Sequence, residues 1–370
     1  EIPLRLVGSE MCIRDSYDCA YCINRRSNDL PRATLSVSEL VELTIEFYRR
    51  NYIEGLFLSS GVVRSPDYTM ERLVRVAKDL RQVHRFNGYI HLKSIPGASR
   101  ELVNEAGLYA DRLSVNVEIP KEENLKLLAP EKDHKSVFAP MKYIQQGVLE
   151  SKEERQKFRH APRFAPAGQS TQMIVGATSE SDKDILYLSS ALYGRPTMKR
   201  VYYSGYVSVN TYDTRLPALK QPPLVRENRL YQADWLLRFY QFKVDEIVDD
   251  AYPDLDLEID PKLSWALRHP EQFPVDINKA DYEMLLRVPG IGVKSAKLIV
   301  ASRRFSRLGF YELKKIGVVM KKAQYFITCR ELPLQMQTVN ELSPQRVRSL
   351  LLPKPKKKVD DRQLILDFGE

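Results

Sequence analysis

A chain of 370 residues is long enough for one large and one small domain, or for two domains of middling size. Its composition, 43% hydrophobic and 28% charged, is typical of globular proteins, and no apolar run approaches the length that a bilayer requires. The opening "EIPLRLVGSE" lacks a basic start and a sustained apolar segment, so we expect no signal peptide and a cytoplasmic protein. The net charge of +9 predicts a polyanionic partner.

Helix-period and strand-like segments alternate through the first half of the chain. Predicted helices cover residues 36–50, 69–80, 99–107, 135–158 and 179–194, and predicted strands cover residues 55–61, 88–95, 112–119, 170–178 and 199–209. Short strands separated by helices of this length indicate βαβ units and a parallel sheet. With one further strand before the cysteines, the pattern predicts an α/β barrel or open half-barrel, whose ligands bind at the carboxyl ends of the strands.

The pattern changes after Asn210. The proline-rich segment "TRLPALKQPPLVREN" indicates a connector, and residues 229–248 predict a long amphipathic helix that packs on another part of the chain. We therefore expect a barrel over residues 17–210, a connector and packing helix over residues 211–274, and a small all-α module over residues 275–330. Residues 331–370 contain few apolar side chains, which predicts a basic flexible tail.

Three of the four cysteines fall between residues 12 and 22, which favours metal or redox chemistry over a disulfide framework. Cys19 and Cys22 form a C-x-x-C step in a loop before a helix, a spacing that allows two thiolates to reach one metal centre. A zinc half-site or a pair of inert thiols would give the same step. A zinc site needs two further soft ligands, however, and the histidines and Cys329 show no matching spacing.

The cysteine step and the repeated βα units together resemble the radical S-adenosylmethionine (SAM) superfamily, with its C-x-x-x-C-x-x-C loop after the first barrel strand. The resemblance implies a partial (β/α)6 TIM-like barrel in which three thiolates hold a [4Fe-4S] cluster and the fourth iron binds SAM. Tyr21 would take the aromatic position that packs near the adenine.

The chain departs from this motif at its first cysteine. That cysteine should stand at position 15, which is Asp15, and the available thiol is Cys12. We assign Cys12, Cys19 and Cys22 as the metal ligands. The chain starts at Glu1 and contains "MCIRDS" before the motif, so we interpret residues 1–16 as an artefact of sequencing or assembly that replaced the native segment.

Within the resemblance, the ends of the predicted strands supply cofactor-binding residues. Asn116 and Glu118 alternate with Val115 and Val117, so both polar groups face the same side, where they could bind the ribose or the methionine part of SAM. Ser59, Ser60 and Gly61 lie at the end of the second predicted strand, where a plain strand-to-helix turn would explain them equally well. The full set of predicted cofactor-binding residues is Tyr21, Ser59, Ser60, Gly61, Lys93, Asn116, Glu118 and Gln172.

The segment "INKADYEMLLRVPGIGVKSAKLIV" resembles a helix-hairpin-helix motif. Asn278 can cap a first helix that ends at Val288, "PGIG" forms the hairpin, and the second helix carries the small Ala296 where close packing is needed. Glycines in the hairpin allow backbone amides to approach a phosphate at the positive end of the second helix. A protein-binding helical hairpin is the alternative.

A second, incomplete copy follows in "ELKKIGVVMKKAQYFI". A tandem pair would contact backbone phosphates without reading the base sequence. The predicted DNA-binding residues of the two copies are Gly290, Gly292, Lys294, Lys297, Gly317, Lys321 and Lys322. Cys329 is interpreted as structural.

The tail contains two further signals. "KPKKK" adds basic charge, and "QLILDF", Gln363 to Phe368, resembles the short peptide by which bacterial repair and replication proteins dock on the sliding clamp. An ordinary chain end with a few apolar residues is the alternative interpretation.

Together with "CINRRSNDLPR" and "RHAPRFAPAGQSTQMIVGA", these features resemble a bacterial family of DNA modification or repair radical SAM proteins. The resemblance implies cleavage of SAM to a 5′-deoxyadenosyl radical that abstracts hydrogen from a nucleotide, and a uracil-DNA-glycosylase-like protein as a partner. Two alternatives remain open: a non-catalytic iron-sulfur protein that binds DNA or senses redox state, and a radical SAM enzyme that modifies tRNA or protein.

Overall fold

The computed structural model describes residues 6–10, 15–31, 33–330 and 343–352. The chain forms two compact units: unit 1 contains Glu1–Asp234 and Val248–Leu255, and unit 2 contains Trp235–Ile247 and Asp256–Glu370. Unit 1 therefore extends past residue 210, where we expected the barrel to end. Within the described residues, no helix has both the length and the apolar character to cross a membrane.

Unit 1 is built around a six-stranded parallel sheet in which the strands pair in sequence order. Parallel strands need crossover connections, and the alternating helices supply them. The α/β class and the parallel sheet typical of a partial barrel are therefore confirmed. The strands are β1 (Leu6–Glu10), β2 (Gly55–Ser59), β3 (Tyr89–Lys93), β4 (Arg112–Ser114), β5 (Gln169–Val175) and β6 (Met198–Gly205).

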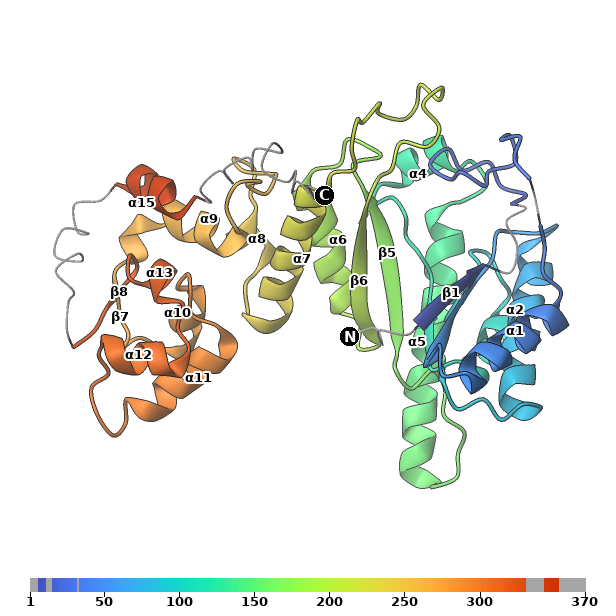
Figure 1. The fold of residues 1–370 in the computed structure, drawn as a ribbon, viewed down its shortest axis with the longest axis horizontal. Coiled ribbons are helices and arrows are strands. Elements are labelled where there is room, and N and C mark those ends of the chain that lie inside the picture. Colours follow the sequence, from blue (N-terminus) through green and yellow to red (C-terminus); the bar gives the residue numbers. More distant parts are fainter. Residues whose placement is uncertain (1–5, 11–14, 32, 331–342, 353–370) are drawn as a thin grey trace, which may run out of the picture. The chain divides into compact units, whose positions relative to one another are not determined.

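The crossover helices begin where the sequence provides capping side chains. Ser36 and Glu39 form a capping box at the start of α1, and Ser65 and Ser181 accept hydrogen bonds from the first turns of α2 and α6. Figure 1 shows α1, α2, α5 and α6 arranged around the sheet. The helices are α1 (Val37–Arg49), α2 (Pro66–Gln82), α3 (Arg100–Tyr109), α4 (Glu122–Leu128), α5 (His134–Lys157) and α6 (Asp182–Tyr193). Of these, α4 was not predicted.

The two faces of the sheet differ in chemistry. On the outer face, Leu56, Ile90, Leu92 and Leu113 are at most 1% exposed and form the core with the helices. On the inner face most of the paired positions carry polar side chains. His91 pairs with Phe57 and with Arg112, and Ser170 pairs with Ser114 and with Arg200. The inner face thus provides a polar surface that leads towards the carboxyl ends of the strands.

Unit 2 is mainly helical. The long helix expected over residues 229–248 is interrupted, because Gln241 adopts a left-handed backbone with φ of 59°. Two helices replace it: α7 (Leu224–Phe239), which belongs to unit 1 as far as Asp234 and to unit 2 from Trp235, and α8 (Val244–Ile247) of unit 2. The remaining elements are α9 (Pro261–Arg268), the 3₁₀ turn η1 (Pro270–Gln272), β7 (Val275–Asp276), α10 (Tyr282–Arg287), α11 (Val293–Ser302), α12 (Phe310–Ile316), α13 (Met320–Ala323), β8 (Ile327–Thr328) and α15 (Pro344–Leu351).

Two short helical hairpins, α10–α11 and α12–α13, pack against each other in unit 2. Gly290 has a φ of +91°, and an added Cβ would lie 2.6 Å from the carbonyl oxygen of Val319. The amide of Val319 donates to the carbonyl of Gly290 at 2.9 Å. Gly290 is therefore needed for the close approach of the second hairpin, in addition to any role towards a ligand.

Two sequence predictions for unit 2 need correction. Asp281, not Asn278, caps α10, because its side chain accepts from the amide of Met284. Asn278 instead bonds to the amide and the carbonyl of Leu308. Part of the predicted tail is the helix α15, where Arg348 pairs with Asp256 and Glu258. The "KPKKK" run and the segment from Gln363 to Phe368 lie outside the described residues.

Candidate cofactor site in unit 1

The loop between β1 and α1 carries both cysteines of the C-x-x-C step. The amide of Cys22 donates to the carbonyl of Cys19 at 2.9 Å, and the amide of Ala20 donates to the carbonyl of Leu128 at 2.6 Å. Cys19 is only 3% exposed and packs in an apolar cluster with Ala20 and Leu128, whereas Cys22 is half-buried. The two cysteines therefore lie on one tight turn, with the Cys19 side chain shielded from water.

A pocket opens beside this turn, at the carboxyl ends of β2, β3 and β4. Its cavity volume is about 130 Å³. The lining residues are Asp15, Tyr17, Cys19, Tyr21, Cys22, Asn24, Ser59, Ser60, Gly61, Val62, Lys93, Ser94, Ile95, Pro96, Asn116, Glu118 and Lys132. Every predicted cofactor-binding residue except Gln172 lies among them. Gln172 is on β5, where its carbonyl accepts from the amide of Glu118 at 3.0 Å.

Sequence reasoning missed Lys132, which lines this pocket together with Lys93. Its Nζ donates to the hydroxyl of Tyr21 at 3.4 Å and lies 3.7 Å from Oε1 of Glu118. Burial lowers the pKa of Lys132, but Tyr21, Cys19 and Glu118 outweigh it and hold the pKa well above its usual value. Lys132 therefore stays charged and attracts negative charge to the pocket.

The same cation acts on the thiol of Cys19. Burial raises the pKa of Cys19 to about 11, and the charge of Lys132 opposes this shift. The thiolate is the metal-binding form of cysteine, so the positive charge of Lys132 favours ligation. Burial likewise raises the pKa of Tyr21 well above its usual value, so its hydroxyl stays protonated.

Asp15 stands where the superfamily motif has its first cysteine. Its Oδ1 accepts from the amides of Tyr17 at 2.9 Å and Val62 at 3.1 Å, and burial raises its pKa. Cys12, the third ligand assigned from the sequence, lies outside the described residues. Within the described ranges, no group of three His, Cys, Asp or Glu side chains is arranged to hold a metal ion. Two of the three thiolates that such a cluster needs, those of Cys19 and Cys22, therefore line the described pocket.

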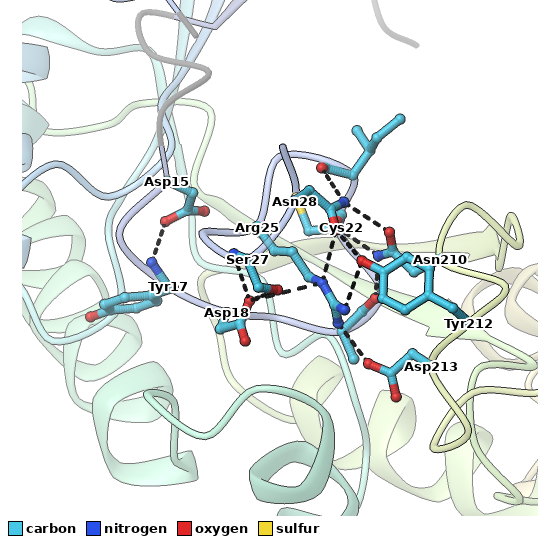
Figure 2. A network of polar contacts seen from close by, with 12 residues as sticks. Asp15, Tyr17, Asp18, Cys22, Arg25, Ser27, Asn28, Asn210, Tyr212 and Asp213 are labelled. Carbon is cyan, nitrogen blue, oxygen red and sulfur yellow. Dashed lines mark hydrogen bonds and ion pairs between the residues drawn. The ribbon is translucent and has the colours of Figure 1, made fainter. Parts of the chain in front are cut away.

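Figure 2 shows a polar network that holds the cysteine loop from the segment after β6. The Nδ2 of Asn210 donates to the carbonyls of Ala20 at 2.6 Å and Cys22 at 3.0 Å, and its Oδ1 accepts from the Nδ2 of Asn28 at 2.8 Å. The connector predicted to start at residue 211 thus begins directly beside the candidate site.

Arg25 is the centre of this network. Its guanidinium donates to Asp213 at 2.6 Å, to the hydroxyl of Tyr212 at 2.9 Å and to Asn28 at 3.2 Å. Arg215 and Arg25 together hold the pKa of Asp213 well below its usual range. The loop is therefore fixed by a buried ion pair whose members lie far apart in the sequence.

Residues 11–148 match the model of the Radical SAM superfamily. This part of the chain is therefore similar to the radical SAM domain, and the superfamily uses a [4Fe-4S] cluster and SAM. No curated protein matches the chain.

Solved structures with a similar fold include three proteins of low sequence identity. HydG, a maturase of the [FeFe]-hydrogenase, is 13% identical with a TM-score of 0.48 over 63% of this chain and 49% of its own. SuiB from Streptococcus suis, bound to SAM, is 10% identical with a TM-score of 0.41 over 63% and 44%. HemN from Escherichia coli, coproporphyrinogen III oxidase, is 14% identical with a TM-score of 0.36 over 73% and 58%. The chain thus spans about half the length of HydG.

Proposed function

We propose that this chain is a radical SAM enzyme that modifies or repairs DNA. The pocket in unit 1 would cleave SAM, and the helical hairpins of unit 2 would hold the DNA backbone. The observation that carries the DNA part is the row of exposed lysines beside the glycine turns of unit 2, namely Lys294, Lys297 and Lys321. Exposed cations around a backbone turn suit phosphate contacts, which bind DNA without reading its sequence.

In unit 1, Cys19 and Cys22 would ligate the cluster, and a third thiolate would complete it. When bound, the cluster and SAM supply a 5′-deoxyadenosyl radical that abstracts a hydrogen atom from the substrate. The chain's own residues would position the cofactor: Tyr21 beside the adenine, and Asn116 and Glu118 towards its polar groups. Lys132 would keep the thiolates and the carboxylate of Glu118 electrostatically balanced.

In unit 2, the start of α11 provides the second part of a phosphate site. The amides of Gly290 and Gly292 make no backbone hydrogen bond to the described residues, and Lys294 and Lys297 are exposed on the helix that follows. Lys322 differs from its neighbours, because its Nζ is paired with Asp260 at 2.6 Å. Among the predicted DNA-binding lysines, we therefore expect Lys294, Lys297 and Lys321 to contribute most.

Two partners remain predictions of the same proposal. The uracil-DNA-glycosylase-like protein follows from the family resemblance, and the sliding clamp follows from the segment between Gln363 and Phe368, which lies outside the described residues.

The cluster part is tested by anaerobic iron-sulfur reconstitution of the chain and of its Asp15→Cys variant, followed by a dithionite assay for 5′-deoxyadenosine. We expect Asp15→Cys to hold about four irons per chain and to cleave SAM, because it places a thiolate at the first position of the superfamily motif. The control Cys329→Ser, added to Asp15→Cys, should leave the iron content unchanged. If neither the unchanged chain nor Asp15→Cys holds iron or cleaves SAM, the enzyme proposal fails.

The DNA part is tested by fluorescence anisotropy with duplex DNA at several salt concentrations. Replacing both lysines in Lys294→Ala/Lys297→Ala should reduce the slope of log K against log[salt] by about 2, since each phosphate contact contributes about 0.9. Lys322→Ala is the matched control and should change the slope less, because its charge is already paired. Equal slopes in all three proteins, or tighter binding of a structured RNA, would refute DNA as the substrate.

A further inference from the structure

Two arginines lie on the inner face of the sheet, below the candidate cofactor pocket. Arg112 is the first residue of β4, and Arg200 lies on β6, where it pairs in register with Ser170 of β5. Ser170 also pairs with Ser114, which stands two residues after Arg112. Because side chains two residues apart point to the same face, both arginines share the face of Asn116 and Glu118, which line the pocket.

Neither arginine has an acidic partner. Among the described residues, no carboxylate forms an ion pair with Arg112 or Arg200, and the buried Nε of each has no hydrogen-bond partner. The carboxylate nearest in sequence, Asp111, is already bound to Arg81 at 2.6 Å and to the amide of Ile90 at 2.8 Å. Both arginines are half-buried, and the side chain of Arg112 also hydrogen-bonds to Tyr89. A buried donor without an acceptor costs free energy, so the two Nε groups favour an anion that a ligand supplies.

Aromatic rings flank the two arginines: Phe57 and His91 lie on β2 and β3, beyond Arg112, and Tyr202 of β6 and Tyr231 of α7 lie beside Arg200. The guanidinium of Arg200 lies 5.5 Å from the ring centroid of Tyr202 and 5.7 Å from that of Tyr231. His91 packs against Phe57 with ring centroids 4.6 Å apart. Burial, Arg112 and Lys93 lower the pKa of His91 to about 3, so His91 is neutral. The positive charge of this face therefore comes from the arginines and from Lys93.

We propose that Arg112 and Arg200 form a subsite for a phosphate group of a nucleotide substrate. This inference rests on the proposed function for the substrate class, whereas the recognition of phosphate rests on the two arginines alone. Arginine guanidinium groups bind phosphate through paired hydrogen bonds, and half-exposed aromatic rings provide stacking faces for a sugar or base. Arg112 precedes Asn116 by four residues, about 13 Å along the strand. A nucleotide whose phosphate lies at Arg112 could therefore extend along the inner face towards Asn116 and the cofactor pocket.

Ligand-observed NMR titration of the full chain tests the subsite with three kinds of probe: deoxynucleoside 5′-monophosphates, the matching deoxynucleosides, and inorganic phosphate. We expect at least one monophosphate to bind about tenfold more tightly than its deoxynucleoside. Arg112→Met and Arg200→Met should each remove that difference, and Arg112→Lys and Arg200→Lys should retain part of it. Arg75→Met, an exposed arginine on α2, is the matched control and should bind as the unchanged protein does.

Three outcomes would overturn the subsite. The first is that no monophosphate binds at a concentration of about 10 mM. The others are unchanged binding in both Met variants and equally tight binding of inorganic phosphate and nucleotide. Thermal unfolding separates a binding loss from misfolding, because a variant that keeps the native fold should unfold at a midpoint close to that of the unchanged protein. If the Met variants unfold at a lower midpoint, the two Lys variants are used to test the subsite. Failure of both Lys variants to retain binding would also count against it. If arginine-dependent nucleotide binding holds while duplex DNA binding fails, the subsite stands and DNA as the substrate is refuted.

Discussion

Two buried lysines, one in each unit, have opposite pKa shifts. In unit 1, Lys132 lies beside Tyr21, Cys19 and Glu118, and its pKa is held well above the usual value. In unit 2, Lys262 is 8% exposed and donates to the carbonyl of Ile291 at 2.5 Å, and burial lowers its pKa to about 7. Both lysines bear the cost of desolvation, so their neighbours decide the sign of the shift.

The neighbours differ in whether a carboxylate is available. Oε1 of Glu118 lies 3.7 Å from Lys132. Near Lys262, Asp260 is bound to Lys322 at 2.6 Å, and the positive charges of Lys322 and Arg287 lower the pKa further. In the pocket of unit 1, the carboxylate of Glu118 therefore keeps the buried ammonium of Lys132 charged. In unit 2 the charges that face solvent are available for a polyanion, and the buried one tends to lose its proton.

The largest effect is expected from Lys132→Met. The substitution leaves Glu118 buried without its cation, which should lower the free energy of unfolding of unit 1 by about 3 kcal/mol. Chemical denaturation followed by far-UV circular dichroism measures this loss. Both tryptophans of the chain, Trp235 and Trp265, belong to unit 2, so the tryptophan fluorescence transition should stay where it is.

The double variant Lys132→Met/Glu118→Gln is the control for this change. It removes the carboxylate along with the cation, so it should recover most of the lost stability. Equal losses in the single and double variants would show that packing of the lysine stem, and not charge balance, makes Lys132 important.

The next largest effect is expected from Asp213→Asn, which tests whether a paired charge also fixes the cysteine loop. The side chains of Arg25 and Asp213 are 5% and 7% exposed, so the substitution removes the nearer counterion of a buried guanidinium and leaves only Asp18, at 3.8 Å from its Nε. The amide oxygen still accepts hydrogen bonds, and we expect a loss of about 2 kcal/mol in the stability of the loop. Native-state hydrogen exchange at the amides of Ala20 and Cys22 should speed up accordingly.

Asp250→Asn is the matched control, because Asp250 pairs with Lys183 while its side chain is 99% exposed. An exposed ion pair contributes little, so exchange in the cysteine loop should not change. Unchanged exchange in Asp213→Asn as well would mean that the hydrogen bonds of Asn210 alone hold the loop.

The sequence predicted the repeating elements well because their signals are local. The helical spacing of Leu40, Val41 and Thr44 corresponds to the buried face of α1, and the alternation around Asn116 and Glu118 corresponds to residues that line the pocket. The short α4 was missed, since seven residues, EENLKLL, give too little periodicity to identify a helix.

The charge pairs that shape the site could not be predicted in the same way. Lys132 and Tyr21 are separated by 111 residues, and Arg25 and Asp213 by 188. No local spacing links such positions, and only the closure of the strands and loops brings them together. The same limit applies to Gly290, whose packing against Val319 depends on the second hairpin.

The smallest effect is expected from Lys262→Met, and it should have the opposite sign to Lys132→Met. The folded protein releases the proton of Lys262 near pH 7, whereas the unfolded chain keeps it until about pH 10.5. Between these values the unfolded state binds more protons, so the stability of the unchanged protein should rise with pH. Below pH 7 the charged lysine is buried at a cost, and there Lys262→Met should be more stable by about 1 kcal/mol.

Denaturation followed by tryptophan fluorescence from pH 6 to pH 10 measures this difference, since both tryptophans report on unit 2. The advantage of Lys262→Met should shrink as the pH rises, because the unchanged protein then folds with a neutral amine. Other titrating groups cancel in the difference between the two proteins. A difference that stays constant with pH would show that Lys262 keeps its proton in the folded state, and that the contrast between the two buried lysines is one of packing rather than of charge.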